Sequence, residues 1–423
     1  MNISKSKIII IAVLMIGMIS CSTAKKVEKD LSKQSEINNY FRGFVVYNTK
    51  NHKEIVNYNG AKYFTPASNT KLFTFYSAFK TFNDSVVGFQ YVKRRDSLII
   101  KGSADPSLLY GFEENRTLDF LKRSERNIYL IDENIAEPPF GDGWSWDDYT
   151  YYYMPEKSLF PIYGNVIELT KGEEIKVIPE FFKDSIKINN EKRARRAYAT
   201  NQFYVKPSDK FEERQIPFVT SNRLVADLLG KEIDKNIQLV KNKENYYFKP
   251  FYSVSYDSLY YKMLHVSDNF IAEQLMLQVG NKVDSTYSVK KAISYSLDNY
   301  MKDIPQKPRW VDGSGLSRYN LFTPESFVYL LKKMYREIPK EKLFDYFPAG
   351  GKSGTLEKYF ANNKPYIFAK TGTLSNNFNL SGYLVTKKGT VLIFSYMNNH
   401  YKGSASERKK EMEVFFKKLY NSY

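Results

Sequence analysis

Three short strings in this sequence could supply the parts of one serine acyl-transfer centre. The first, Ser68-Asn-Thr-Lys71, places a hydroxyl and an amine three residues apart, which on a helix puts both on one face. A serine hydroxyl needs a neighbouring base before it can attack a carbonyl, and a buried lysine near another cation can be that base. We therefore expect Ser68 as the nucleophile and Lys71 as its base, an arrangement that needs no histidine, metal or cofactor.

The second string, Ser267-Asp268-Asn269, lies between two predicted helices. The Ser267 hydroxyl could pass a proton to a leaving amine, and the Asn269 amide could bind a peptide carbonyl. All three residue types are also favoured as plain helix N-caps. Taken alone, this string indicates a cap more than a catalytic group.

The third string, Lys370-Thr-Gly-Thr373, follows a predicted strand over Pro365–Ala369. On an edge strand, Gly372 would let a substrate backbone lie close. Thr371 and Thr373 could hold a terminal carboxylate, and Lys370 would add positive charge. The alternative is a β-turn with a solvated lysine.

A similar string, Lys352-Ser-Gly-Thr355, follows Pro348-Ala-Gly-Gly351 and lies among turn residues. Because no strand precedes it, we favour Lys370 as the third motif. Each string is a weak signal alone, but the set S-x-x-K, S-D-N, K-T-G in this order is specific to one class of serine enzymes.

The elements that must position these strings can also be read from the sequence. The helix after Ser68 is apolar on most of its circumference, so we expect it to be buried. The two chain ends carry strand patterns, which predict one antiparallel sheet made from both ends. The helices are expected at Leu72–Phe79, Tyr256–His265, Phe270–Val279 and Glu407–Leu419, and the strands of two hairpins at Gly43–Thr49 with Glu54–Tyr58 and Leu380–Val385 with Thr390–Tyr396.

The region 81–250 carries none of the three motifs and has the pattern of short strands separated by turns. These strands are expected at Ser97–Lys101, Asn127–Asp132, Gly164–Thr170, Glu174–Ile178 and Asp184–Ile188. We therefore predict a catalytic domain formed by residues 36–80 and 251–423, with inserted domain(s) at 81–250.

The N-terminus has the pattern of a bacterial export signal. Lys5 and Lys7 precede an apolar run, Ile8–Ile19, which is short for a membrane span. Met18-Ile19-Ser20-Cys21 resembles a lipoprotein cleavage box, so we expect a signal peptide at 1–20, a lipid on Cys21 and a tether at 21–35. The alternative is an ordinary cleaved signal with an incidental cysteine.

Composition limits the class of protein further. The 423 residues are 43% hydrophobic, which suffices for a large core, and Cys21 is the single cysteine, so internal disulfides are excluded. The net charge of +17 would suit a nucleic-acid partner. Export and the scatter of the basic residues argue against that partner.

The sequence from about Gly43 to its C-terminus resembles the low-molecular-mass class C penicillin-binding proteins, the D-alanyl-D-alanine carboxypeptidase/endopeptidase family. The segments that carry this resemblance are Pro66–Leu72, Lys101–Pro106, Met263–Asn269 with Ala272-Glu273, Asp312–Arg318 with Thr323-Pro324, and Ala369–Leu374 with Leu380–Tyr383.

The resemblance implies an α/β (α+β) fold: a transpeptidase-like domain with an antiparallel sheet flanked by helices, plus a β-rich insert. It implies an acyl-enzyme on Ser68, a proton relay through Ser267, substrate binding by Asn269 and Lys370–Thr373, and an oxyanion hole of the Ser68 and Thr373 backbone amides. The implied substrate is the D-Ala-D-Ala end, or the D-amino cross-link, of peptidoglycan stem peptides, and β-lactams would acylate the same serine. Carboxypeptidase and endopeptidase action are both left open.

Three other interpretations have less support in the sequence. A Ser-His-Asp hydrolase would have to use His52, His265 or His400, and none accompanies a G-x-S-x-G string. A β-lactamase shares the motifs, but a large insert is foreign to the compact ones. A wall-binding lipoprotein without activity could use the aromatic stretch 144–153 to stack on sugars, although such residues are more often part of a core.

Overall fold

The structure, a computed structural model, describes residue 29 and residues 40–112, 116–172, 174–189, 196–206, 208, 211–242 and 246–423. The predicted signal peptide, the predicted lipid site Cys21 and most of the predicted tether lie outside the described residues. None of the helices in the described part of the chain has the length and apolar character that crossing a membrane would require.

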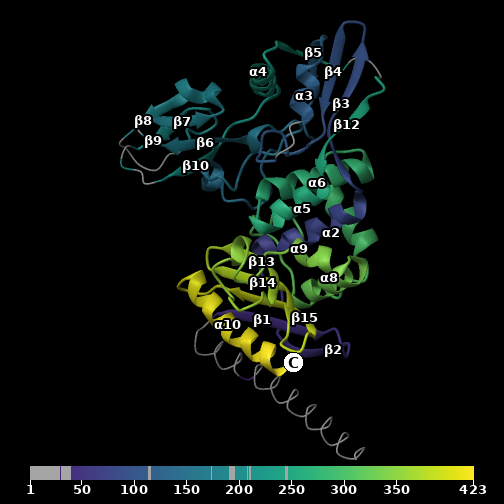
Figure 1. The fold of residues 1–423 in the computed structure, drawn as a ribbon, viewed down its shortest axis with the longest axis vertical. Helices are drawn as coiled ribbons and strands as arrows, with labels where there is room; N and C mark the ends of the chain where they lie inside the picture. Colours follow the sequence, from purple (N-terminus) through teal and green to yellow (C-terminus); the bar gives the residue numbers. More distant parts are fainter. Residues whose placement is uncertain are drawn as a thin grey trace, which may run out of the picture.

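A five-stranded sheet is built from both ends of the chain, as predicted (Figure 1). Its order is β13-β14-β15-β1-β2, and every neighbouring pair is antiparallel. The strands are β1 (Phe41–Asn48), β2 (Lys53–Tyr58), β13 (Ile367–Leu374), β14 (Asn377–Val385) and β15 (Val391–Asn399). The strand that carries the third motif, β13, is therefore an edge strand, as expected.

Successive side chains of β1 point to opposite faces of this sheet, and each face is covered by helices. Phe44 and Val46 pack with Phe416 of the closing helix α10 (Ala405–Ser422). Val45, between them, belongs to the core on the other face, together with Phe327 of α8 (Pro324–Glu337). The predicted closing helix and the predicted α+β class are both confirmed.

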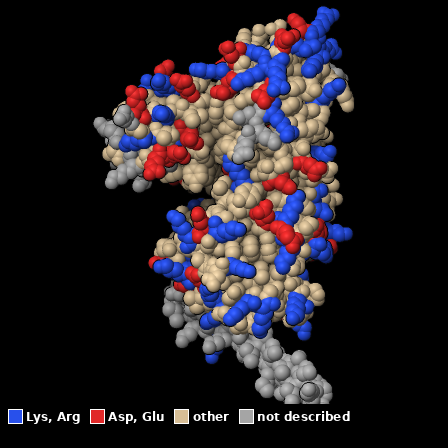
Figure 2. All heavy atoms as spheres, viewed as in Figure 1, with Lys and Arg blue, Asp and Glu red and all other residues tan. Residues whose placement is uncertain are grey.

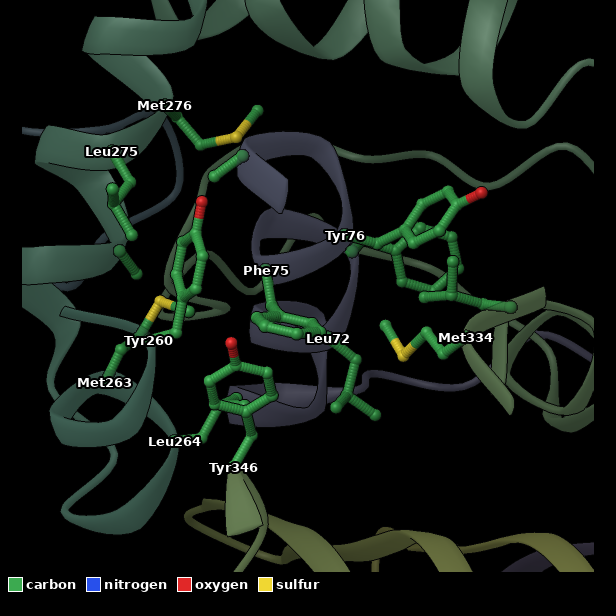
Figure 3. Packing of buried hydrophobic residues seen from close by; sticks show 14 of the residues in the cluster. Leu72, Phe75, Tyr76, Tyr260, Met263, Leu264, Leu275, Met276, Met334 and Tyr346 are labelled. Carbon is green, nitrogen blue, oxygen red and sulfur yellow. The ribbon is translucent and has the colours of Figure 1, made fainter. Parts of the chain in front are cut away.

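The second core surrounds α2 (Lys71–Thr81), the helix that follows Ser68. Figure 3 shows Phe75 and Tyr76 of α2 between residues of α5 and α6 on one side and Met334 of α8 on the other. Residues 71–78 of α2 are all buried, which confirms the predicted burial. The helices of this layer are α5 (Tyr256–His265), α6 (Asn269–Asp284), α7 (Val289–Tyr295), the π turn Ser296–Tyr300, α8 and α9 (Lys340–Asp345).

The region between α2 and α5 forms further sheets at the other end of the molecule (Figure 1). One sheet has the order β11-β5-β4-β3-β12 and packs with two helices. Its elements are β3 (Ser85–Arg94), β4 (Ser97–Gly102), β5 (Asn127–Ile131), β11 (Ile237–Val240), β12 (Lys249–Ser255), α3 (Arg116–Lys122) and α4 (Asn222–Ile233).

A lobe with the remaining strands projects to one side. It contains β6 (Val166–Lys171), β7 (Ile175–Ile178), β8 (Ile186–Ile188), β9 (Phe203–Val205), β10 (Glu213–Pro217) and the 3₁₀ turns Tyr163–Asn165 and Glu180–Ser185. All five strands predicted between residues 81 and 250 are present. The strand expected from Gly164 begins two residues later, because Gly164 has a φ of +63° inside a 3₁₀ turn. The proposed domain bounds stay a prediction.

Candidate active site

The three motifs meet at one cavity of about 810 Å³. Ser68, Ser267, Asn269, Thr371 and Thr373 all line it. The two lysines lie beneath its surface, since Lys71 and Lys370 are fully buried. Residues separated by about 100 to 200 positions in the sequence are thus brought together by the fold.

Lys71 is held by three oxygen atoms. Its Nζ lies 2.9 Å from Ser68 Oγ, 2.6 Å from Asn269 Oδ1 and 2.6 Å from Ser314 O. Burial lowers the pKa of Lys71 to about 8, although three nearby carboxylates oppose this shift. A lysine with such a pKa is partly neutral near neutral pH, so it can accept a proton from Ser68.

The backbone around Ser68 is folded tightly. Ser68 lies in the 3₁₀ turn Ala67–Thr70, which runs directly into α2, so serine and lysine occupy adjacent turns. Ala67 has a φ of +49°, a conformation that L-residues rarely adopt and that is often found at functional sites. A Cβ atom on Gly315 would lie 2.0 Å from Ala67 O, so only glycine fits against this turn.

The same serine–lysine spacing occurs at Ser288 and Lys291 with a different result. Ser288 caps α7 by accepting a hydrogen bond from Lys291 N at 3.2 Å. Its hydroxyl donates to Glu137, and the Lys291 side chain is 57% exposed. There the string is a plain cap with a surface lysine, whereas at Ser68 the two side chains contact each other.

A second serine–lysine pair lies beside the first. Lys370 Nζ donates to Ser267 Oγ at 2.8 Å and to Thr371 O at 2.8 Å. Burial, and then the charge of Lys71, lower the pKa of Lys370 well below its usual value. Ser267 has a φ of +63°, which is a strained conformation for serine.

The residues next to Ser267 combine a structural and a site role. Asp268 caps α6 by accepting from Ile271 N at 2.9 Å, so the cap that its residue type suggested is present. Its other carboxylate oxygen accepts a hydrogen bond from Tyr110 Oη at 2.8 Å. Asn269 donates from Nδ2 to Tyr153 O at 2.8 Å and presents Oδ1 to Lys71.

The glycine of the third motif is required by a neighbour within the protein. A Cβ atom on Gly372 would lie 2.4 Å from Pro66 O and 2.9 Å from Asn69 N. The expectation that this glycine admits a substrate backbone stays a prediction; within the protein, the turn that carries Ser68 also approaches it closely. Gly372 thereby allows the first and third motifs to pack together.

The disfavoured string 352–355 contributes one residue to the site. Thr355, in the 3₁₀ turn Gly354–Leu356, lines the cavity, and its Oγ1 lies 2.9 Å from Thr371 Oγ1. Lys352 is exposed at the surface. The preference for Lys370 agrees with this geometry, but sequence reasoning missed Thr355.

A loop that contains Asp312 packs against Lys71. Asp312 is buried and accepts hydrogen bonds from Gly315 N, Ser317 N, Asn320 Nδ2 and Trp144 Nε1, at 2.6 to 2.9 Å. The segment was noted in the sequence, but its contact with Lys71 through Ser314 O was not. Trp144 comes from the predicted insert, and so do Tyr152 and Tyr153, which line the cavity.

The cavity lies where the lobe with β6–β10 faces the catalytic sheet. Gln215 of β10 and Thr373 of β13 both line it. Figure 2 shows the surface hollowed between that lobe and the lower part of the molecule.

The described residues give less support to catalysis by a histidine or by a metal ion. None of the residues that line the cavity is a histidine, and His265 Nε2 lies 3.0 Å from Asp345 O. The described part of the chain holds no cluster of three or more histidine, cysteine, aspartate or glutamate side chains suited to a metal ion.

Comparison with known proteins decides the family. The model of the D-Ala-D-Ala carboxypeptidase 3 (S13) family matches residues 23–216 and 249–419. This chain belongs to that family. Its class is therefore that of a serine-type D-Ala-D-Ala carboxypeptidase, in agreement with the resemblance noted in the sequence.

A carboxypeptidase of Haemophilus influenzae is similar to this S13 member along most of its length, in sequence and in structure. D-alanyl-D-alanine carboxypeptidase DacB of Haemophilus influenzae is 24% identical over 436 residues, which cover 90% of each chain. The crystal structure of penicillin binding protein 4 of that organism has a TM-score of 0.72 at 21% identity, covering 90% of this chain and 96% of that one. A second structure of it, complexed with a β-lactam, has a TM-score of 0.69 at 20% identity and covers 90% and 95%. These structures show a shared fold.

Proposed function

We propose that this protein is a serine D,D-peptidase that cleaves the D-Ala-D-Ala terminus or the D-amino cross-links of peptidoglycan through an acyl-enzyme on Ser68. The observation that carries the proposal is the 2.9 Å contact between Lys71 Nζ and Ser68 Oγ at the cavity that the three motifs share. Family membership supports the same reaction class.

Acylation would begin with Lys71 in its neutral form. Lys71 takes the Ser68 hydroxyl proton while Ser68 Oγ forms a bond to the carbonyl carbon after D-Ala. The backbone amides of Ser68 and Thr373 are the proposed donors to the oxyanion. The carbon–nitrogen bond then breaks, and Ser267 delivers a proton to the leaving amine and regains one from Lys370. In the second step water attacks the ester carbonyl and gives its proton back to Lys370 through Ser267. The bond to Ser68 Oγ then breaks, and Lys71 returns its proton to Ser68.

Substrate recognition is assigned to the third motif and to Asn269. Thr371 and Thr373 line the cavity on edge strand β13, and Lys370 lies behind them. Their hydroxyls can donate to a terminal carboxylate, and the lysine charge favours an anion there. A β-lactam carries a carboxylate in the matching position, so we propose that β-lactams acylate Ser68.

Fluorescent penicillin tests the nucleophile and the base. We expect stoichiometric covalent label on the purified protein, no label on Ser68→Ala, and much slower labelling of Lys71→Ala. The matched control is Ser288→Ala, which removes the serine of another S-x-x-K string and should label at the normal rate. Label retained by Ser68→Ala, or a normal rate for Lys71→Ala, would overturn the assignment.

Product analysis tests the peptidase activity and its preference. A D-Ala-D-Ala pentapeptide and isolated cross-linked muropeptides are digested in parallel with the purified protein. Release of D-Ala shows carboxypeptidase action, and conversion of dimers to monomers shows endopeptidase action. If neither product forms, the proposed function is wrong even if penicillin binds.

We also propose that the protein acts in the periplasm and is held at the envelope by lipid on Cys21. The support is the residue pattern before Cys21 and the cell-wall substrate of the family. Several acyl chains on one residue would anchor firmly, at about 0.8 kcal/mol per buried methylene. In cell fractionation, Cys21→Ser should move the protein from the membrane to the soluble fraction. An unchanged distribution would contradict the anchor.

A further inference from the structure

The backbone of the loop Gly313–Gly315, which contacts Lys71, forms hydrogen bonds with side chains of two helices. Gly313 O accepts a hydrogen bond from Thr74 Oγ1 of α2 at 2.6 Å. Ser314 N, in the same peptide unit, donates to Glu273 Oε1 of α6 at 2.7 Å. Both ends of this peptide unit are therefore fixed by buried side chains.

The next peptide unit contacts the proposed base directly. Ser314 O accepts from Lys71 Nζ at 2.6 Å, and Gly315 N donates to Asp312 Oδ1 at 2.9 Å. Glu273 and Lys71 are thus bonded to the two ends of one residue, Ser314. A shift of the Ser314 backbone would change what Lys71 contacts.

The position of Ser314 O decides where the lone pair of a neutral Lys71 points. A neutral amine has two N–H groups and one lone pair. Ser314 O and Asn269 Oδ1 can only accept, so they take the two N–H groups. The lone pair then faces Ser68 Oγ, which is the orientation that removing the serine proton requires.

Glu273 also belongs to the buried charge cluster around Lys71. Burial, and then Asp312, raise the pKa of Glu273 to about 7, while Lys157 and the hydrogen bonds from Ser314 oppose that rise. Lys157 is itself paired with Glu137 at 3.1 Å. The carboxylates that raise the pKa of Lys71 are Asp312, Asp268 and Glu273.

We propose that Glu273 is a positioning residue for acylation: it holds the Ser314 backbone so that Ser314 O faces Lys71, and its carboxylate, when ionised, adds to the negative charge near that lysine. The inference rests on the proposed function, in which Lys71 is the base for Ser68. An ionised Glu273 favours the ammonium form of Lys71, and a neutral side chain at this position favours the amine.

Two substitutions separate the effect of the Glu273 charge from the effect of fixing the loop Gly313–Gly315. Glu273→Gln keeps an oxygen that can accept from Ser314 N but removes the charge. The acid limb of the acylation rate, measured with fluorescent penicillin across pH, should move to lower pH by a few tenths of a unit, because Glu273 is the last of three carboxylates that act on Lys71. Thr74→Val releases Gly313 O without a change of charge, so it should lower the rate about tenfold and leave the midpoint unmoved.

Glu156→Gln is the matched control. Glu156 is also buried, also has a raised pKa and also accepts from a backbone amide, Thr220 N, but it is bonded within the inserted region. We expect its pH profile to equal that of the wild type. A midpoint for Glu273→Gln equal to that of the wild type would overturn the inference.

The outcomes also separate this inference from the proposed function. If the wild-type protein takes no label, the proposed function fails. If the wild-type protein is labelled by penicillin but Glu273→Gln does not shift the midpoint of the acid limb, the inference alone fails. Circular dichroism checks folding of each variant. Should Glu273→Gln not fold, Glu273→Asp decides, since it keeps the charge but shortens the reach: slower labelling at an unmoved midpoint supports the positioning role, and a wild-type rate contradicts it.

Discussion

Lys370 Nζ lies 2.8 Å from Ser267 Oγ, and Lys71 Nζ lies 2.9 Å from Ser68 Oγ. The site therefore contains two serine–lysine pairs, in each of which the lysine is buried and the serine lines the cavity. Burial, and then the positive charge of Lys71, lower the pKa of Lys370, so a second positive charge is disfavoured there. Two such pairs can divide the work, one removing the serine proton and the other supplying a proton to the leaving amine.

The pH dependence of acylation should follow the ionisation of Lys71. Only the neutral amine can accept the serine proton, and burial lowers the pKa of Lys71 to about 8. The rate should therefore fall about tenfold per pH unit below that value and level off above it. Stopped-flow measurement with a chromogenic β-lactam gives the profile. A rate that is constant from acid to alkaline pH would contradict Lys71 as the base.

Lys370→Ala should strongly reduce acylation, because it removes both the charge behind Thr371 and the partner of Ser267. We expect a loss of about 10² to 10³-fold in the acylation rate constant. Lys352→Ala is the matched control from the similar string 352–355, and it should have no measurable effect because Lys352 is exposed. Equal effects of the two substitutions would contradict the assignment of the third motif to Lys370–Thr373.

Gly372→Ala should damage the site through the backbone. The added Cβ would lie 2.4 Å from Pro66 O, so the turn that carries Ser68 must shift. We expect a loss of about 1–3 kcal/mol in the free energy of unfolding and slower acylation. Gly172→Ala is the control, because its nearest contact would be an ordinary 3.7 Å. Denaturant unfolding and penicillin labelling measure both effects.

Asp312→Ala should destabilise the loop that supports Lys71. It leaves two buried backbone N–H groups, those of Gly315 and Ser317, without their acceptor. Each such loss costs about 1–3 kcal/mol, so the midpoint of urea unfolding should fall clearly. As a control, Asp227→Ala removes an exposed ion pair to Arg223 and should change the midpoint of urea unfolding little. If the two variants unfold alike, the hydrogen bonds of Asp312 do not support the loop.

Much of the framework could be predicted from local pattern. The closing helix, the sheet from both chain ends and the meeting of the three motifs follow from periodicity and from residue types in a known order. The strand β3 (Ser85–Arg94) was missed, because its buried residues Val86 and Phe89 lie three positions apart and do not show the alternation of a strand with one buried face.

The supporting contacts could not be predicted, because they depend on loops that meet only in the folded chain. Thr355 was set aside with its string, yet it contacts Thr371 across a packing of loop against strand. The path from Glu273 through Ser314 to Lys71 joins residues up to 243 positions apart. Nothing in the local sequence of Ser314 indicates that its carbonyl faces a lysine.

The first strand of the catalytic sheet, β1, pairs along its whole length with the last strand, β15. A chain still being synthesised therefore exposes Ser68 and Lys71 long before the sheet that carries Thr373 can close beside them. Pairing of such distant segments is slow compared with local folding. Acylation of Ser68 should therefore become possible only when the sheet has closed. A truncated or nascent polypeptide should not react with penicillin, even though it contains Ser68.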